Sequence, residues 1–181
     1  GYLRDGVDGW RLDVAMDIGM KWLTELTAAA HREKPGSLVV GEIANYPKEW
    51  FPAVDGIMHF TMKNILLGLM NGDIDAQHAR RMIERMYRDS DFEHMLMSWI
   101  YLDNHDTPRL AHMVNDPQRR RLAQLLQFTL PGSPNLYYGT ELGMTGGDDP
   151  EMRAPMRWDW VNDQNVSLTW TKQLIQLRRN H

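Results

Sequence analysis

The alternation of short apolar segments with longer helical patterns limits the folds open to this 181-residue chain more than any other feature. The segments with strand character are Val7–Asp13, Leu38–Ile43, Gly56–Phe60, Ser98–Asn104 and Asn135–Tyr138. The segments with helical periodicity are Ile18–Lys34, Thr61–Met70, Ala76–Arg88, Gln118–Leu130 and Ser167–Arg179. Strands that alternate with helices predict βα units around a parallel sheet, so we expect an α/β fold.

The number of residues in each βα unit favours a barrel. One βα unit is expected per ~30 residues, whereas a complete (β/α)₈ TIM barrel needs roughly 250 residues. Five strands in 181 residues therefore predict a partial (β/α)₈ barrel. The other parallel architecture, a doubly wound nucleotide-binding domain, requires a glycine-rich phosphate fingerprint after its first strand, and none is present there.

Composition excludes several classes of function. The chain has 20 Lys and Arg against 24 Asp and Glu, and its longest basic block is Arg119-Arg120-Arg121, which argues against nucleic acid as a partner. No apolar run is long enough to cross a membrane, and no signal-peptide pattern opens the chain. The absence of cysteine excludes a disulfide scaffold, a thiolate nucleophile and a Cys-ligated metal. We therefore expect a cytoplasmic protein with no nucleic-acid or membrane partner.

Three of the expected strands end in an acidic side chain with polar neighbours: Asp13, Glu42 and Asp106. Taken alone, an acidic residue at the end of a strand is more often a helix cap or a turn residue. In parallel α/β folds, however, ligands bind at the carboxyl ends of the strands, where side chains from neighbouring strands converge. Three carboxylates at equivalent strand ends therefore predict a single acidic site.

Glycoside hydrolysis is a reaction that uses such carboxylates, since one attacks the anomeric carbon while another protonates the leaving oxygen. Arg11 lies two residues before Asp13 and can keep a nucleophilic carboxylate ionised. His105 and Asp106 can bind sugar hydroxyls and oppose positive charge at the reacting centre. A metal site formed by His105, Asp106 and the nearby Asp103 is a weaker alternative for the same cluster.

Four segments resemble, in order, the catalytic barrel of the α-amylase family of glycoside hydrolases. Gly6–Val14 (G-V-D-G-W-R-L-D-V) is similar to the family's fourth-strand motif, and Gly41–Ala44 (G-E-I-A) to its fifth-strand motif. Tyr101–Arg109 (Y-L-D-N-H-D-T-P-R) resembles the seventh-strand motif, and Leu130–Thr145 the eighth strand with its loop. The chain is most similar to the group of neopullulanase, cyclomaltodextrinase and maltodextrin glucosidase.

This resemblance implies a role for each matching residue. Asp13 would be the nucleophile, Glu42 the acid/base and Asp106 the stabiliser of the transition state, with Arg11 orienting Asp13 and His105 binding the sugar. The implied function is that of a retaining glycoside hydrolase acting on α-1,4-glucans, maltodextrins or cyclodextrins through a covalent glycosyl-enzyme intermediate. The implied partner is an α-glucan oligosaccharide substrate.

The resemblance also implies what this chain lacks. Residues 1–181 correspond to about strands four to eight and their helices, as a single incomplete domain that starts abruptly at Gly1. The first three strands, the loop domain and the C-terminal β-sandwich have no counterpart. The usual calcium site lies largely in those parts, so no cofactor and no metal are expected here. The alternative is a truncated, catalytically silent fragment that is structural or binds carbohydrate weakly. The two open edges of the sheet predict self-association.

Overall fold

A computed structural model describes all residues 1–181 and has the expected α/β class, with one five-stranded sheet. Its strands are β1 (Gly9–Leu12), β2 (Leu38–Ile43), β3 (Gly56–His59), β4 (Trp99–Ile100) and β5 (Ser133–Pro134). The order across the sheet is β1-β2-β3-β4-β5, and the printed pairings from β1 to β4 are parallel. Strand order that follows the chain order is the winding of a (β/α) barrel, because a doubly wound sheet reverses its order at a switch point. The chain thus forms part of a barrel.

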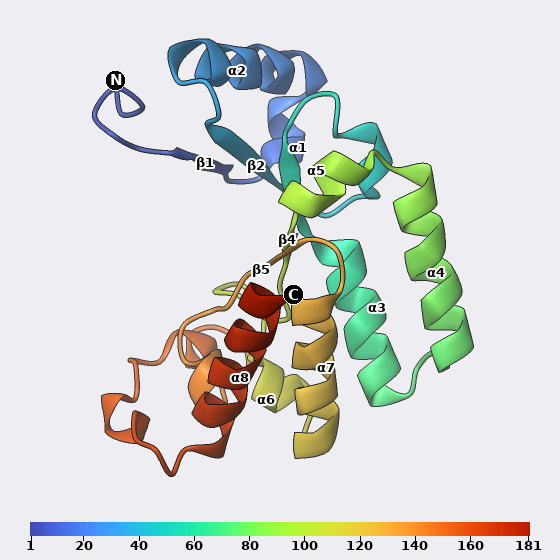
Figure 1. Cartoon of the computed structure of the whole chain (residues 1–181), viewed down its shortest axis with the longest axis vertical. Helices are drawn as coiled ribbons and strands as arrows, with labels where there is room; N and C mark the ends of the chain where they lie inside the picture. Colours follow the sequence, from blue (N-terminus) through green and yellow to red (C-terminus); the bar gives the residue numbers. More distant parts are fainter. The chain divides into compact units, whose positions relative to one another are not determined.

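The helices are α1 (Ala15–Ile18), α2 (Met20–Glu33), α3 (Phe60–Asn71), α4 (Ala76–Asp89), α5 (Phe92–Met97), α6 (Leu110–Met113), α7 (Pro117–Thr129) and α8 (Val166–Asn180) (Figure 1). None of them is long and apolar enough to cross a membrane. By its internal packing the chain divides into two compact units. Unit 1 comprises residues 1–62, 80–100 and 131–133, and unit 2 comprises residues 63–79, 101–130 and 134–181. The expectation of a single domain over 1–181 stays a prediction.

Unit 1 holds the parallel strands, and one glycine shows how closely they approach. Gly9 pairs with Leu38 at the start of β1, where a Cβ would lie 2.2 Å from the Leu38 carbonyl oxygen. Only glycine fits there without moving the backbone. Val39, Ile43 and Ile57, which lie on β2 and β3, are fully buried. The strands are thus the core of unit 1, as expected for a parallel sheet.

Unit 2 is built mainly from helices and loops, with α7 and α8 side by side (Figure 1). Asp116 caps the start of α7, where Pro117 occupies the first helical position. Asn165 caps α8 by accepting a hydrogen bond from the Leu168 N–H at 3.0 Å. Both helices therefore begin where a side chain satisfies their free N–H groups.

Two strand predictions were wrong in extent or position. The expected strand Ser98–Asn104 is reduced to Trp99–Ile100, because the chain then forms a turn in which the Asn104 side chain accepts from the Asp106 N–H at 3.1 Å. The expected strand Asn135–Tyr138 is displaced to Ser133–Pro134. There the Ser133 N–H donates to the Ser98 carbonyl at 2.8 Å, whereas the Asn135 carbonyl accepts from the Gln127 side chain at 2.7 Å.

Candidate active site

In unit 1, one guanidinium group joins the two carboxylates that sequence analysis singled out. Arg11 Nη1 donates to Asp13 Oδ1 at 2.5 Å, and Arg11 Nη2 lies 3.1 Å from Glu42 Oε2. The side chains of Arg11 and Glu42 are 22% and 15% exposed, whereas that of Asp13 is 77% exposed. The arrangement therefore has an accessible carboxylate, a more buried one and a cation that contacts both.

Strand register explains why these groups meet. Side chains two residues apart lie on the same face of a strand, so Arg11 and Asp13 project in the same direction. Val40 is the partner of Arg11 across β1 and β2, which brings Glu42, two residues later, onto the same face. Glu42 in turn pairs with Met58 on β3, whose sulfur lies 3.4 Å from Arg11 Nε. Three neighbouring strands thus contribute side chains to one face.

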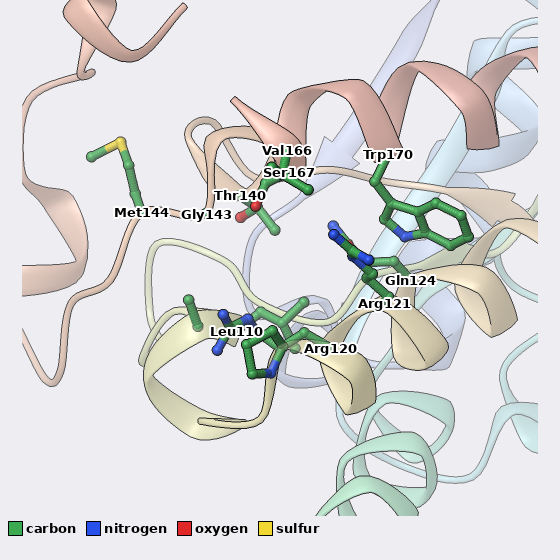
Figure 2. A pocket seen from close by; sticks show the side chains of 12 residues that line it. Leu110, Arg120, Arg121, Gln124, Thr140, Gly143, Met144, Val166, Ser167 and Trp170 are labelled. Carbon is green, nitrogen blue, oxygen red and sulfur yellow. The ribbon is translucent and has the colours of Figure 1, made fainter. Parts of the chain in front are cut away.

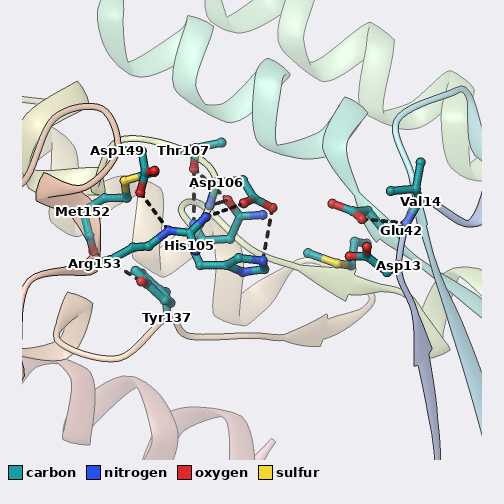
Figure 3. Close-up of polar contacts among 12 residues, drawn as sticks. Asp13, Val14, Glu42, His105, Asp106, Thr107, Tyr137, Asp149, Met152 and Arg153 are labelled. Carbon is teal, nitrogen blue, oxygen red and sulfur yellow. Dashed lines mark hydrogen bonds and ion pairs between the residues drawn. The ribbon is translucent and has the colours of Figure 1, made fainter.

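A strained residue follows Asp13. Val14 has a φ of +40°, a left-handed conformation that a β-branched side chain rarely adopts. In this conformation its backbone N–H donates to Glu42 Oε2 at 2.9 Å, a contact drawn in Figure 3. The Glu42 carboxylate therefore has two positively polarised neighbours, the Val14 N–H and Arg11. Backbone strain of about 1–2 kcal/mol persists only where surrounding contacts hold it, which often marks a functional site.

In unit 2, His105 and Asp106 form the second set of predicted residues. His105 Nε2 lies 3.1 Å from Asp106 Oδ2. Arg153 Nη2 donates to Asp106 Oδ1 at 3.1 Å, and Arg153 Nε lies 3.0 Å from Asp149 (Figure 3). The side chains of His105, Asp106 and Arg153 are close to half exposed, so a ligand can reach them. The spatial approach of Asp106 to Asp13 and Glu42 stays a prediction.

The turn that carries His105 and Asp106 rests on a buried acid. Asp103 is 2% exposed and accepts hydrogen bonds from the Leu110 N–H and the Thr140 hydroxyl, each at 2.8 Å. Burial raises the pKa of Asp103, although these hydrogen bonds act in the opposite direction. Burial likewise lowers the pKa of Lys63, while the Asp103 charge acts to raise it. Asp103 thus joins the start of the turn to Leu110, at its other end, and to Thr140.

Arg109 is a second buried anchor in unit 2. It is fully buried with its guanidinium 4.7 Å from the ring centres of both Tyr137 and Tyr138, and its Nη1 donates to the Tyr138 carbonyl at 2.6 Å. Burial, with a contribution from Tyr138, raises the pKa of Tyr137 to about 12. The Arg109 backbone N–H also donates to the Gly146 carbonyl at 2.9 Å. Arg109 therefore ties the turn to the segment that follows β5.

Sequence analysis missed the role of Arg153, because no local spacing connects it with Asp106 across 47 residues. It also gave no weight to Met58, which strand pairing alone places beside Arg11. For the metal alternative, the Asp103 carboxylate is occupied by Thr140 and Leu110 and does not join His105 and Asp106 in a set of ligands. No cluster of three or more His, Asp or Glu side chains in the chain has the arrangement of a metal site.

Comparison with known proteins gives a consistent result. The family model for the catalytic domain of alpha-amylase matches residues 1–181. A cyclomaltodextrinase from a Bacillus species is 31% identical over 180 residues, covering 97% of this chain and 32% of that protein. The intracellular maltogenic amylase of Bacillus subtilis is 29% identical over 177 residues, covering 96% of this chain and 30% of that protein.

Solved structures include the ligand-free cyclic alpha-maltosyl-(1→6)-maltose hydrolase of Arthrobacter globiformis, which superimposes with a TM-score of 0.94 at 28% identity. That match covers 99% of this chain and 42% of the other. The chain spans about a third of the length of the curated relatives above. Because the family model and the fold agree over its whole length, the chain belongs to the α-amylase family.

Proposed function

We propose that this chain carries the catalytic carboxylates of a retaining glycoside hydrolase that acts on α-1,4-glucans, maltodextrins or cyclodextrins. The observation that carries the proposal is the contact of Arg11 with both Asp13 and Glu42, in a chain whose residues 1–181 match the family model for the catalytic domain. A carboxylate pair on neighbouring strands is what the double displacement at an anomeric carbon requires.

In the first step, an Asp13 oxygen attacks the anomeric carbon while Glu42 donates its proton to the glycosidic oxygen. The bond from the anomeric carbon to that oxygen breaks, and an ester forms between the sugar and Asp13. Arg11 orients Asp13, because its Nη1 donates to the attacking carboxylate. Asp106 opposes the positive charge that develops on the sugar, and His105 binds a sugar hydroxyl.

In the second step, Glu42, now a carboxylate, accepts a proton from water while the water oxygen attacks the anomeric carbon. The ester bond to Asp13 breaks, and Glu42 is again protonated for the next cycle. Two inversions at the same carbon give net retention of configuration. This course requires carboxyl groups about 5–5.5 Å apart, whereas an inverting enzyme needs about 6.5–9.5 Å to accommodate the water.

The test measures release of reducing sugar from maltodextrin and β-cyclodextrin by the wild-type protein and by Asp13→Asn and Glu42→Gln. Each substitution should lower kcat by at least about 100-fold. With an activated substrate such as a maltosyl fluoride, whose leaving group needs no proton, Glu42→Gln should accumulate a covalent adduct on Asp13 that is visible by mass spectrometry. Wild-type protein that binds maltodextrin without releasing sugar would favour the silent, carbohydrate-binding alternative.

We also propose a cytoplasmic location, which the lack of cysteine supports. Fractionation of the source cells with an antibody against the chain tests this.

Self-association is proposed for the 181-residue chain because β1 is an edge strand that pairs only with β2. Light scattering at micromolar concentration should then give a mass above the 21.1 kDa of one chain. A mass of 21.1 kDa at all concentrations would contradict it.

A further inference from the structure

Unit 2 contains a pocket of about 130 Å³ that none of the candidate catalytic residues lines. It lies between the first turns of α7 and α8 (Figure 2). Its polar lining comes from Arg120, Arg121, Gln124, Thr140, Ser167 and Trp170. Because a water molecule takes about 30 Å³ in the liquid, the pocket has room for about four waters or a ligand of about five heavy atoms.

Two donors at this pocket, the Trp170 indole and the Arg121 guanidinium, have no acceptor within the chain. Trp170 Nε1 is buried and has no hydrogen-bond partner. Figure 2 shows Arg121 and Gln124 of α7 directed toward that indole. Arg121 is exposed and forms no ion pair with a carboxylate. An indole N–H and a guanidinium are both donors only, so an acceptor placed between them would satisfy both.

The nearby carboxylates are already engaged. Asp116 accepts from the Gln118 and Arg119 N–H groups at the start of α7. Asp103 accepts a hydrogen bond from the hydroxyl of the lining residue Thr140. Neither acid forms a hydrogen bond or an ion pair with Trp170 or Arg121.

Further positively polarised groups line the pocket. Arg120 adds a second guanidinium, which is fixed by donation from its Nη1 to the Val114 and Asn115 carbonyls at 2.9 and 2.8 Å. Pro117 and Val166, the first residues of α7 and α8, line the pocket too, so the positive ends of two helix dipoles lie near it. The size of the pocket and the unpaired donors in its lining favour a small anion.

We propose that this pocket binds a phosphate group, held by Arg121 and the Trp170 indole N–H with support from Arg120. A tetrahedral oxyanion of five heavy atoms matches the volume and accepts from several donors at once. Because Arg121 is exposed and unpaired, its side chain can move to admit the ligand and then close on it. The source is free inorganic phosphate or the phosphate of a sugar ester, which share this chemistry.

The test follows the indole N–H signals of the ¹⁵N-labelled chain during titration with inorganic phosphate at constant ionic strength. Seven tryptophans give seven such signals, and Trp170→Phe identifies the one that belongs to Trp170 by its loss. We expect this signal to shift saturably. Calorimetry on Arg121→Gln and on Trp170→Phe should give a Kd raised by about tenfold or more, since each removes one charge-assisted hydrogen bond.

The matched controls are Arg179→Gln, which removes an exposed arginine of α8 outside the pocket, and Trp22→Phe in unit 1; both should bind as wild type. Tighter binding of glucose 1-phosphate than of phosphate would identify a sugar ester as the ligand, and equal binding would identify free phosphate. The proposal is overturned if the Trp170 signal does not move, if glucose alone moves it equally, or if Arg121→Gln binds phosphate as wild type does. The last comparison holds even if Trp170→Phe fails to fold.

Discussion

The two units hold their candidate site residues by different means. In unit 1, strand register places Arg11, Asp13 and Glu42 together, and the cation is two residues from the carboxylate it binds. In unit 2, Asp106 lies on a turn, and its cation, Arg153, comes from 47 residues further along the chain. A regular ladder fixes side-chain direction by its period of two, whereas a turn depends on individual side-chain hydrogen bonds and long-range partners.

This difference predicts that removing the cation held by a strand, Arg11, lowers kcat/KM more than removing the cation held by a loop, Arg153. Arg11→Met keeps the apolar stem of the side chain but removes the guanidinium that contacts both Asp13 and Glu42. We expect kcat/KM on maltodextrin to fall by about 100-fold or more, comparable to the loss of a preorganised donor at a reacting centre. Arg81→Met, on an exposed face of α4, is the control and should retain full activity. Equal activity of the two variants would refute the importance of the shared guanidinium.

The pH dependence of the unfolding free energy tests the contribution of a buried histidine in unit 1. Burial lowers the pKa of His59 to about 4, so between pH 6.5 and 4 this imidazole is neutral in the folded state and protonated in the unfolded state. Stability should therefore decrease as the pH falls through this window, by about 3 kcal/mol from His59 at its full extent. In urea unfolding, His59→Leu should flatten the pH dependence, whereas the exposed His78→Gln should not. An unchanged slope in His59→Leu would assign the acid sensitivity elsewhere.

The buried anchor of the unit 2 turn should respond in the opposite direction. Thr140→Val removes the hydroxyl that donates to Asp103 and should cost about 1–2 kcal/mol of unfolding free energy. That hydrogen bond favours the ionised acid, whose pKa burial raises, so the loss should grow as the pH rises. Thr145→Val, at an exposed position, is the matched control for urea melts at two pH values. A loss that does not depend on pH would mean that the Asp103 carboxylate does not change its charge.

The smallest effect is expected at Arg153, whose pair with Asp106 is about half exposed. Exposed ion pairs contribute about 0–1 kcal/mol, so Arg153→Met should reduce kcat/KM by no more than about fivefold. The effect should diminish further at high salt, because exposed charges are screened. Steady-state kinetics on maltodextrin at low and high salt measures both. A loss as large as that of Arg11→Met would remove the distinction between the two units.

Local signals in the sequence were sufficient for most of the secondary structure. Strand β2 was predicted as Leu38–Ile43 and is found there. Helices α4 and α7 were predicted as Ala76–Arg88 and Gln118–Leu130, and they are found at Ala76–Asp89 and Pro117–Thr129. The short helices α1, α5 and α6 were not predicted, because four to six residues carry too little periodicity to be recognised.

The sequence by itself determined the α/β class, the βα order and the pairing of Arg11 with Asp13, since each depends on neighbours within a few residues. Tertiary structure alone decided that Arg11 also reaches Glu42, that Val14 adopts a left-handed conformation, and that Arg153 contacts Asp106. It also decided where β4 and β5 end, because turn hydrogen bonds there displaced the strand ladder. The physical reason is the same throughout: periodicity and caps act locally along the chain, whereas ion pairs and strain depend on which distant segments packing brings together.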